Sequence, residues 1–435
     1  MGKILMQDGL VITMATEKPD VAKRDILIEG SRISQIGENI TSSSVDKVID
    51  ASNKVIMPGL INCHNHAAMT LFRGYSDDLR LMEWLTERIW PAEELLTDED
   101  VYWGTMLASI EMIKSGTTTF ADMYFHMNHV ALAVKDSGIR ASLCRALLFH
   151  DNEGQQRIKE TYEFFNKWHG AAGGRITTMV GPHAPYTCPP DKMRLVLDLV
   201  KELKSGVHIH LAETIEEVNQ IFNSFGKSPT KYLSDLGVFE CNRVLLAHCV
   251  NLSRDDIYLL RNLQGGISYN PISNQKLGCG IAPVKELRDL GITVGMGTDG
   301  AGSATTLDMF EEIKAAAWMQ KNRLYDPKVI SAYKVLQMAT LEGAKALGME
   351  NEIGTLEMGK KADIILVDIE KPHLYPHNDI CALLAYSAQG GDVDTTIING
   401  EIVMENRRLL TVDEKEILKQ AEICARRVTG RVDIV

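Results

Sequence analysis

The sequence lacks the features of membrane-spanning and secreted proteins. No uninterrupted apolar run approaches the roughly 18 residues that cross a bilayer, and the N-terminus carries no basic region followed by an apolar segment. The eight cysteines are scattered and include no C-x-x-C pair, a pattern typical of reduced thiols rather than of a disulfide framework. We therefore expect a cytoplasmic protein that does not use a membrane as a partner.

Basic residues are fewer than acidic ones: the sequence has 46 lysines and arginines and 58 aspartates and glutamates, which gives a net charge of -12. Nucleic acids and anionic membranes are bound by clustered positive charge, so neither is expected as the main partner. A small-molecule substrate is the better expectation, and the sequence leaves a homo-oligomer open. With 435 residues, of which 45% are hydrophobic, the chain can bury one large core and a smaller second one.

The two ends of the chain share a pattern of short alternating strands. Residues 1–57 contain such strands with glycines at the turns, and residues 362–368 and 395–405 repeat the style, the latter around an Asn-Gly turn. Helical periodicity is weak in the first of these regions. We expect residues 1–57 and 355–435 to pair into one discontinuous β-sandwich domain.

Strands and helices alternate between these two ends. Each apolar strand-like run is followed by an amphipathic stretch, and eight such units most simply close into a (β/α)8 TIM barrel over residues 58–354. An open doubly wound sheet is the alternative α/β architecture, but no Gly-rich phosphate fingerprint follows the first strand to support its nucleotide-cofactor version. The runs are Val55–His64 and residues 117–122, 141–148, 176–181, 206–211, 243–247, 265–269 and 292–298.

Two histidines, His64 and His66, follow the apolar part of the first predicted strand. Side chains alternate along a strand, so both point to the same face, and two neutral imidazoles on one face provide half of a divalent-metal site. The spacing alone is a weak signal, but barrel enzymes keep their chemistry at the carboxyl ends of their strands. The pair therefore predicts a metal site at one rim of the barrel.

Other predicted strands also end in polar residues that would meet at this rim. Alternation puts His208 and His210 on the same face, and His210 lies nearer the mouth, so we predict His210 as a ligand and His208 as a hydrogen-bonded core residue. Glu213, three residues further on, is placed to act as a general acid/base, although an ordinary helix-start residue is the alternative. The strand-end residues are His183, His208, His210, Glu213, His248 and Asp299.

Together these motifs resemble the amidohydrolase superfamily over essentially the whole chain, and within it the mononuclear-metal deaminases. The binuclear branch carries a bridging lysine on strand four, and the corresponding stretch Arg175–Gly181 has none. The resemblance therefore implies one divalent ion per chain, Zn²⁺ with Fe²⁺ as the alternative. Its ligands would be His64, His66, His210 and Asp299.

Further stretches are similar to the 5-methylthioadenosine/S-adenosylhomocysteine deaminase family. They are residues 83–85, 91–93, 122–126, 181–186 and 270–278. The similarity implies hydrolysis of the 6-amino group of 5′-methylthioadenosine, S-adenosylhomocysteine or a related adenosine derivative to the inosine analogue and ammonia. It implies catalytic roles for Glu213, His248 and Asp299. It also implies that the substrate is contacted by Trp84, Glu93, Arg145, Arg157, His183, Glu213 and Asp299.

Two alternatives stay open. One is a different amidohydrolase on the same scaffold, such as a 5′-deoxyadenosine, guanine or triazine deaminase or a dechlorinase, and here the pair Glu93 and His183 favours a nucleoside. The other is a non-catalytic, amidohydrolase-like assembly protein, against which the retention of every ligand type argues. The cytidine deaminase class is excluded because its H-x-E and P-C-x-x-C patterns are absent from the sequence.

Overall fold

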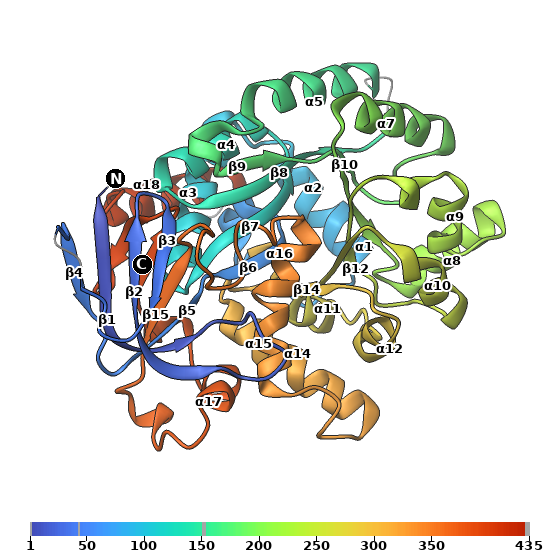
Figure 1. Cartoon of the computed structure of the whole chain (residues 1–435). Coiled ribbons are helices and arrows are strands. Elements are labelled where there is room, and N and C mark those ends of the chain that lie inside the picture. Colours follow the sequence, from blue (N-terminus) through green and yellow to red (C-terminus); the bar gives the residue numbers. More distant parts are fainter. Residues whose placement is uncertain (1, 42–43, 150–153, 431–435) are drawn as a thin grey trace.

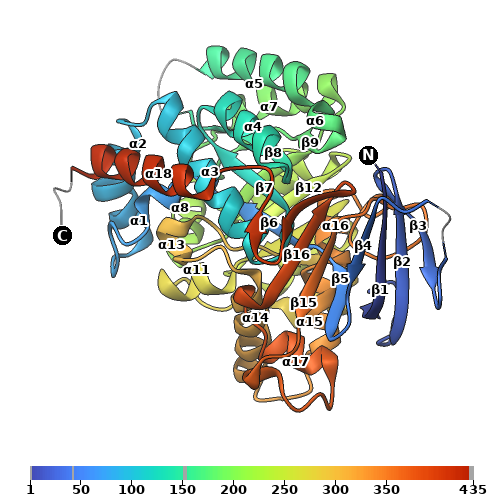
Figure 2. The ribbon, with the colours of Figure 1, turned by 90° about the vertical axis from the view of Figure 1, so that its left-hand side faces the viewer.

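The structure is a computed structural model that describes residues 2–41, 44–149 and 154–430. Within these ranges, a barrel of parallel strands surrounded by helices lies beside a mixed sheet (Figure 1). In the perpendicular view, strands from the beginning of the chain lie next to strands from near its end (Figure 2). The α/β fold with a unit built from both chain ends is thus confirmed.

The mixed sheet contains nine strands within the described ranges, in the order β18-β17-β16-β15-β5-β1-β2-β3 with β4 beside β1. The two chain ends meet where β5 runs antiparallel to β15, with Met57 opposite Ile365. The Asn-Gly turn between β16 and β17 has positive φ at Asn399 (53°) and Gly400 (78°), as a tight hairpin requires. The strands therefore form one hydrogen-bonded sheet. Their bounds are Lys3–Ile12 (β1), Val21–Glu29 (β2), Arg32–Gly37 (β3), Lys47–Asp50 (β4), Lys54–Pro58 (β5), Ile364–Asp368 (β15), Val393–Ile398 (β16), Glu401–Glu405 (β17) and Arg408–Leu409 (β18).

The barrel strands are parallel and follow one another in chain order. One junction is made by the amide of His208, which donates to the carbonyl of Val180 (3.0 Å), and the barrel closes where the amide of Asp299 donates to the carbonyl of His64 (2.9 Å). The predicted (β/α)8 barrel is therefore present. Its strands are Leu60–Asn65 (β6), Thr117–Tyr124 (β7), Arg140–Leu147 (β8), Ile176–Thr178 with Gly181–Pro182 (β9 and β10), Val207–Leu211 (β11), Val244–His248 (β12), Gly265–Tyr269 (β13) and Val294–Met296 (β14).

Helices cover the outside of the barrel because each carries one apolar stripe. In α7, Met193, Val196, Leu199 and Val200 are buried at the spacing of a single helical face. The longer helices are Asp98–Lys114 (α3), Met127–Ser137 (α4), Gly154–Trp168 (α5), Pro190–Leu203 (α7), Ile215–Phe225 (α8), Met309–Leu324 (α14) and Glu414–Thr429 (α18). The shorter ones are Ala67–Phe72 (η1), Leu81–Trp84 (α1), Leu85–Ile89 (η2), Trp90–Glu93 (α2), Ala171–Gly174 (α6), Pro229–Asp235 (α9), Val238–Glu240 (η3), Arg254–Leu259 (α10), Leu260–Asn262 (η4), Pro271–Lys276 (α11), Val284–Asp289 (α12), Ala301–Ala304 (α13), Ala332–Met338 (α15), Leu341–Leu347 (α16), Pro372–Leu374 (η5), Ile380–Tyr386 (α17) and Gly390–Asp392 (η6). No helix in the described ranges is long and apolar enough to cross a membrane.

The apolar run predicted as one strand, Val55–His64, is two strands that break at Gly59. The first part, β5, belongs to the mixed sheet and the second, β6, to the barrel. A Cβ at Gly59 would lie 2.1 Å from the Thr118 Oγ1, so only glycine allows the chain to pass this point. The break places the mixed sheet directly before the first barrel strand.

A buried ion pair joins the barrel to the mixed sheet. The guanidinium of Arg140 in β8 donates from two nitrogens to the Asp363 carboxylate, at 2.7 and 2.9 Å. Asp363 also accepts from the amide of Asn399 at 2.7 Å. Both charged side chains are almost fully buried, so the pair depends on its own hydrogen bonds rather than on water.

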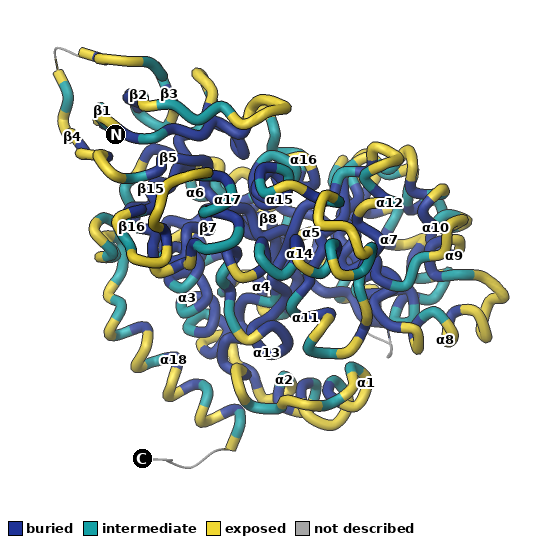
Figure 3. Tube along the Cα trace, turned by 90° about the horizontal axis from the view of Figure 1, so that it is seen from below, coloured by how far each residue is buried: buried dark blue, intermediate teal, exposed yellow. Residues whose placement is uncertain are grey.

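The C-terminal helix α18 lies against the barrel rather than against the mixed sheet. Its buried residues are Ile417, Ala421, Cys424 and Val428. Buried and exposed stretches alternate along α18 in Figure 3. The helix is capped by the Asp413 carboxylate, which accepts from two backbone amides. Thr411, two residues earlier, donates its hydroxyl to the carbonyl of Ser137 at 2.8 Å.

Candidate active site

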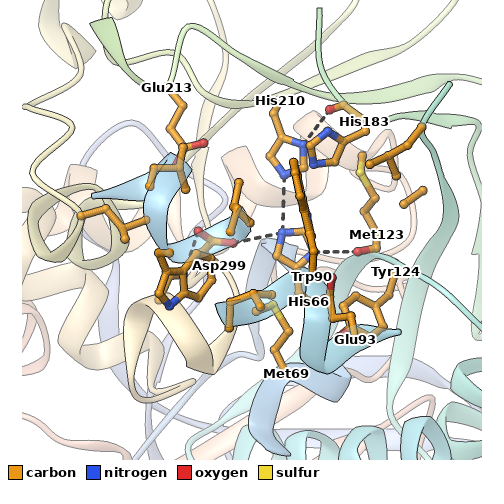
Figure 4. A pocket seen from close by; sticks show the side chains of 18 of the residues that line it. His66, Met69, Trp90, Glu93, Met123, Tyr124, His183, His210, Glu213 and Asp299 are labelled. Carbon is orange, nitrogen blue, oxygen red and sulfur yellow. Dashed lines mark hydrogen bonds and ion pairs between the residues drawn. The ribbon is translucent and has the colours of Figure 1, made fainter. Parts of the chain in front are cut away.

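A pocket opens at the carboxyl ends of the barrel strands, where the predicted strand-end residues converge (Figure 4). Its floor is polar, and its upper wall is apolar and comes largely from the helical segment α1–η2–α2. The structure therefore brings together residues that are far apart in the sequence. The predicted residues that line it are His66, Trp84, Glu93, His183, His210, Glu213, His248 and Asp299.

The four predicted metal ligands point their donor atoms at one another. Asp299 Oδ1 lies 3.4 Å from His64 Nε2 and 3.3 Å from His66 Nε2. His66 Nε2 lies 3.4 Å from His210 Nε2. Two ligands bound tetrahedrally to a zinc ion, each about 2.0–2.1 Å from it, lie about 3.3–3.4 Å apart. These three distances are therefore those expected between ligands of one tetrahedral divalent ion, and His64 belongs both to the donor group with His66 and Asp299 and to the group with His210 and His248.

Hydrogen bonds behind the imidazoles fix which nitrogen faces the centre. Nδ1 of His66 donates to the Met123 carbonyl (2.6 Å) and Nδ1 of His210 to the His183 carbonyl (2.7 Å), which leaves each Nε2 with a free lone pair. His64 Nε2 is buried and has no hydrogen-bond partner within the described ranges. A buried acceptor left without a partner is costly, and a cation between these nitrogens would satisfy it.

The protonation states suit metal binding. Burial, followed by the neighbouring histidines, lowers the pKa of His66 to about 4 and that of His210 well below its usual range, so both rings are neutral. Burial alone would raise the pKa of Asp299, but the surrounding imidazoles hold it well below its usual range. Neutral imidazoles and an ionised carboxylate are the forms that bind a divalent ion.

Two serines hold the other oxygen of Asp299. Oδ2 accepts from the hydroxyls of Ser273 (2.6 Å) and Ser303 (3.1 Å), which turns Oδ1 toward the histidines. Sequence reasoning did not identify either serine, and only Ser273 lies in a stretch that it had singled out. Their effect is to fix the carboxylate in one orientation.

Glu213 lies on a turn that a second glutamate locks in place. The carboxylate of Glu217 accepts from the amides of Ala212 (3.0 Å) and Glu213 (2.9 Å), where Ala212 has a positive φ of 49°. Burial, followed by the charge of Asp299, raises the pKa of the Glu213 side chain well above its usual range. No role was predicted for Glu217, although a glutamate in the first turn of a predicted helix could have suggested a capping role.

His248 differs from the three other imidazoles in its tautomer. Its Nδ1 accepts from the side-chain amides of Asn274 (2.9 Å) and Asn270 (3.3 Å). Asn270 is held in this orientation because its oxygen accepts from the Ser268 hydroxyl at 2.8 Å. His248 Nε2 must therefore carry the proton, and it faces Glu213 Oε2 at 3.7 Å. Burial lowers the pKa of His248 to about 3, so the ring is a neutral donor.

The upper wall carries Trp84, Trp90 and Glu93 on the helical segment α1–η2–α2. The Trp84 indole donates to the Ser76 carbonyl at 3.0 Å, which fixes its ring. Trp90, which was not among the predicted site residues, lines the pocket as well (Figure 4). Burial raises the pKa of Glu93 to about 7, against the opposing influence of the neighbouring Tyr124 hydroxyl.

Arg145 and Arg157 lie in a second cavity that shares Trp90 and Glu93 with the first. The Arg145 guanidinium forms an ion pair with Glu160, a residue that sequence reasoning had not identified. Arg157 donates to the carbonyl of Leu148 at 2.9 Å. The two arginines therefore lie beside the wall that carries Trp90 and Glu93 and do not line the first pocket.

The chain is similar to known proteins, in sequence and in structure, over nearly its whole length. Residues 55–403 match the amidohydrolase family. A 5-methylthioadenosine/S-adenosylhomocysteine deaminase from Desulforudis audaxviator is 51% identical over 433 residues, which cover 99% of this chain and 100% of the relative. A 5′-deoxyadenosine deaminase from Methanosarcina acetivorans is 48% identical over 435 residues and covers 100% of both chains.

A solved structure of an adenosine deaminase from Xanthomonas campestris with bound zinc superimposes with a TM-score of 0.94. It is 30% identical and covers 98% of this chain and 99% of its own. The family resemblance expected from the motifs is confirmed by these matches. The chain belongs to the amidohydrolase family.

Proposed function

We propose that this chain is a metal-dependent deaminase that replaces the 6-amino group of an adenosine derivative with oxygen and releases ammonia. The proposed substrates are 5′-methylthioadenosine and S-adenosylhomocysteine, the compounds that name the Desulforudis relative. One observation carries the proposal, namely that Asp299 Oδ1 lies 3.3–3.4 Å from the His64 and His66 nitrogens, and His66 Nε2 lies 3.4 Å from His210 Nε2, beside a buried glutamate.

One divalent ion per chain is assigned to His64, His66, His210 and Asp299. Nitrogen and oxygen donors at tetrahedral spacing favour Zn²⁺, which is also bound in the Xanthomonas structure, and Fe²⁺ is the alternative. When bound, such an ion acts as a Lewis acid that makes water nucleophilic near neutral pH.

The protein's own groups then move protons and orient the reactants. Glu213 accepts a proton from the attacking water and returns it to the ring nitrogen beside the carbon under attack. His248 donates from Nε2 to the incoming oxygen, because its Nδ1 is occupied by the Asn274 amide. Asp299, held by the Ser273 hydroxyl, takes the second proton of the attacking water and passes it to the amino group, which leaves as ammonia while the carbon-oxygen double bond forms.

Substrate recognition is assigned to the apolar wall and the second cavity. Trp84 packs against the purine, and Glu93 accepts hydrogen bonds from the ribose hydroxyls. His183 contacts the base or the sugar from the opposite side. Arg145 and Arg157 reach the carboxylate that S-adenosylhomocysteine carries and methylthioadenosine lacks.

5′-Deoxyadenosine is the second candidate substrate. Arg145 already has a carboxylate partner in Glu160, so the second cavity does not require a substrate carboxylate to balance it. The Methanosarcina relative also bears the name of a 5′-deoxyadenosine deaminase. Both candidates share the same chemistry at the purine.

The test is ammonia release from methylthioadenosine, S-adenosylhomocysteine, 5′-deoxyadenosine, adenosine and guanine, together with elemental analysis of the purified chain. We expect one divalent ion per chain and the highest kcat/KM on one of the first two compounds. His66→Ala should lose both ion and activity, whereas His377→Ala, at an exposed position outside the pocket, should lose neither. Two ions per active chain, or guanine as the best substrate, would overturn the proposal. The oligomeric state and the cytoplasmic location stay predictions.

A further inference from the structure

The three histidines of the proposed metal site are supported from behind in two different ways. His66 and His210 each donate from Nδ1 to a backbone carbonyl, which can only accept. His64 instead places its Nδ1 2.9 Å from Nε2 of another histidine, His208 in β11. A histidine accepts a hydrogen bond at Nε2 in only one of its two neutral tautomers, the one with the proton on Nδ1.

The contact continues across the barrel interior. Nδ1 of His208 lies 3.5 Å from the Cys144 sulfur in β8, and that sulfur lies 3.4 Å from the Asp122 carbonyl in β7. His64, His208, Cys144 and Asp122 are all at most 1% exposed, so no water competes for these contacts. The four residues form what we call the rear chain, which runs from the pocket floor into the core.

Each proton in the rear chain has only one available place once His64 binds a cation through Nε2. His64 must then carry its proton on Nδ1 and donate it to His208 Nε2. His208 must carry its own proton on Nδ1, and the hydrogen-bonding neighbour of that nitrogen within the described ranges is the Cys144 sulfur. The Cys144 thiol proton is directed to the Asp122 carbonyl.

The charge states agree with this arrangement. Burial, followed by the neighbouring histidines, lowers the pKa of His208 well below its usual range, so its ring is neutral. Burial, followed by the Asp122 charge, raises the pKa of the Cys144 thiol well above its usual range, so the sulfur keeps its proton. Every link in the rear chain is therefore a bond between neutral groups.

We propose that His208 is a positioning residue that fixes the tautomer and orientation of His64 for metal binding, and that Cys144 in turn fixes the tautomer of His208. The inference rests on the proposed metal site and goes beyond it, since neither residue touches the ion or the substrate pocket. Partners behind metal-binding histidines commonly contribute about 10–100-fold to metal affinity.

The experiment compares Zn²⁺ affinity of the full-length chain, measured by competition with a chromophoric chelator, in matched variants. His208→Leu keeps the approximate volume but has no acceptor, and we expect about 10–100-fold weaker Zn²⁺ binding. His208→Gln offers an amide oxygen as acceptor and should recover most of that loss. Circular dichroism and thermal melting of the metal-free chains show whether each variant is folded.

Cys144 is tested in the same assay. Cys144→Ala removes both hydrogen-bonding functions of the sulfur, and we expect about 3–10-fold weaker Zn²⁺ binding, smaller than the effect at His208 because the change lies one link further from the ion. Cys144→Ser keeps a donor and an acceptor and should bind more tightly than the alanine variant. If His208→Leu does not fold, the comparison of His208→Gln with the two Cys144 variants decides the matter.

The outcomes separate this inference from the metal site itself. Unchanged affinity in His208→Leu, or an equal loss in His208→Leu and His208→Gln, would show that His208 acts only by packing and would overturn the inference. Equal affinities in the wild type, Cys144→Ala and Cys144→Ser would remove Cys144 from it. His66→Ala is the reference, since retention of the ion in that variant would refute the metal site rather than the rear chain.

Discussion

Replacing Glu213 with glutamine removes a charge from the pocket while leaving the side chain almost the same shape. The residue is 7% exposed, and its backbone amide donates to the Glu217 carboxylate, a contact that the substitution does not touch. The turn that carries residue 213 should therefore stay in place. Any change in activity then reports the loss of the carboxylate itself.

The magnitude follows from the role assigned to this carboxylate. Its raised pKa, caused by burial and then by Asp299, suits a group that must both accept and return a proton near neutral pH. Positioned proton transfer contributes about 10²–10⁴-fold to rate, which is about 2.7–5.4 kcal/mol at 1.36 kcal/mol per tenfold. We expect kcat of Glu213→Gln to fall by this factor.

The assay combines ammonia release with elemental analysis, because Glu213 also belongs to a second cluster of donor atoms with His248 and Asp299. A variant that keeps its ion but loses turnover identifies Glu213 as the base. Loss of the ion together with activity would make Glu213 a ligand, and near-normal turnover would refute the proton-transfer role. Glu216→Gln, exposed in the first turn of α8 just after residue 213, is the matched control and should behave as the wild type.

Three further predictions concern the sugar, the amino-acid tail and the stability of the fold. The pKa of Glu93 is raised to about 7 by burial, so its carboxylate is ionised above that pH. The preference for ribose over 2′-deoxyribose substrates in kcat/KM should reach about 1.5–3 kcal/mol above pH ~8 and shrink below pH ~6, and a preference independent of pH would remove Glu93 from the sugar site. Arg145→Ala should lower kcat/KM for S-adenosylhomocysteine by an amount equivalent to about 1.5–3 kcal/mol and leave kcat/KM for methylthioadenosine nearly unchanged. Equal losses on both substrates would make this arginine structural. Arg140→Leu leaves the Asp363 carboxylate buried without its partner and should reduce the free energy of unfolding by about 3–5 kcal/mol. Urea unfolding should then show a lower midpoint, and an unchanged midpoint would contradict a stabilising ion pair.

Periodicity in the sequence was sufficient to predict the fold. The alternation of apolar runs with amphipathic stretches predicted a (β/α)8 barrel, and the barrel is present with strands close to the predicted runs. The break at Gly59 was not predicted, because the apolar run from Val55 to His64 is continuous in the sequence. Only the different pairing partners of its two halves, Ile365 for Met57 and Thr119 for Ile61, divide it between two sheets.

The placement of the candidate site was also predictable, because parallel strands put their carboxyl ends at one rim. That rule gathered His64, His66, His210 and Asp299 from positions far apart in the chain, although their roles stay predictions. The same rule could not predict that Trp90 lines the pocket, because Trp90 lies in a helical segment. An aromatic residue there has the same local pattern whether it packs in a core or lines a pocket.

Sequence alone established the residue types and the face of each strand on which they lie. The partner of each imidazole nitrogen was decided only by the tertiary structure, as His64 and His208 show, since they are 144 residues apart and meet at 2.9 Å inside the closed barrel. The reason is one of scale. A period of two along a strand determines on which face a side chain lies, whereas a hydrogen bond depends on atomic positions to within a fraction of an ångström, and these exist only after all eight strands have closed.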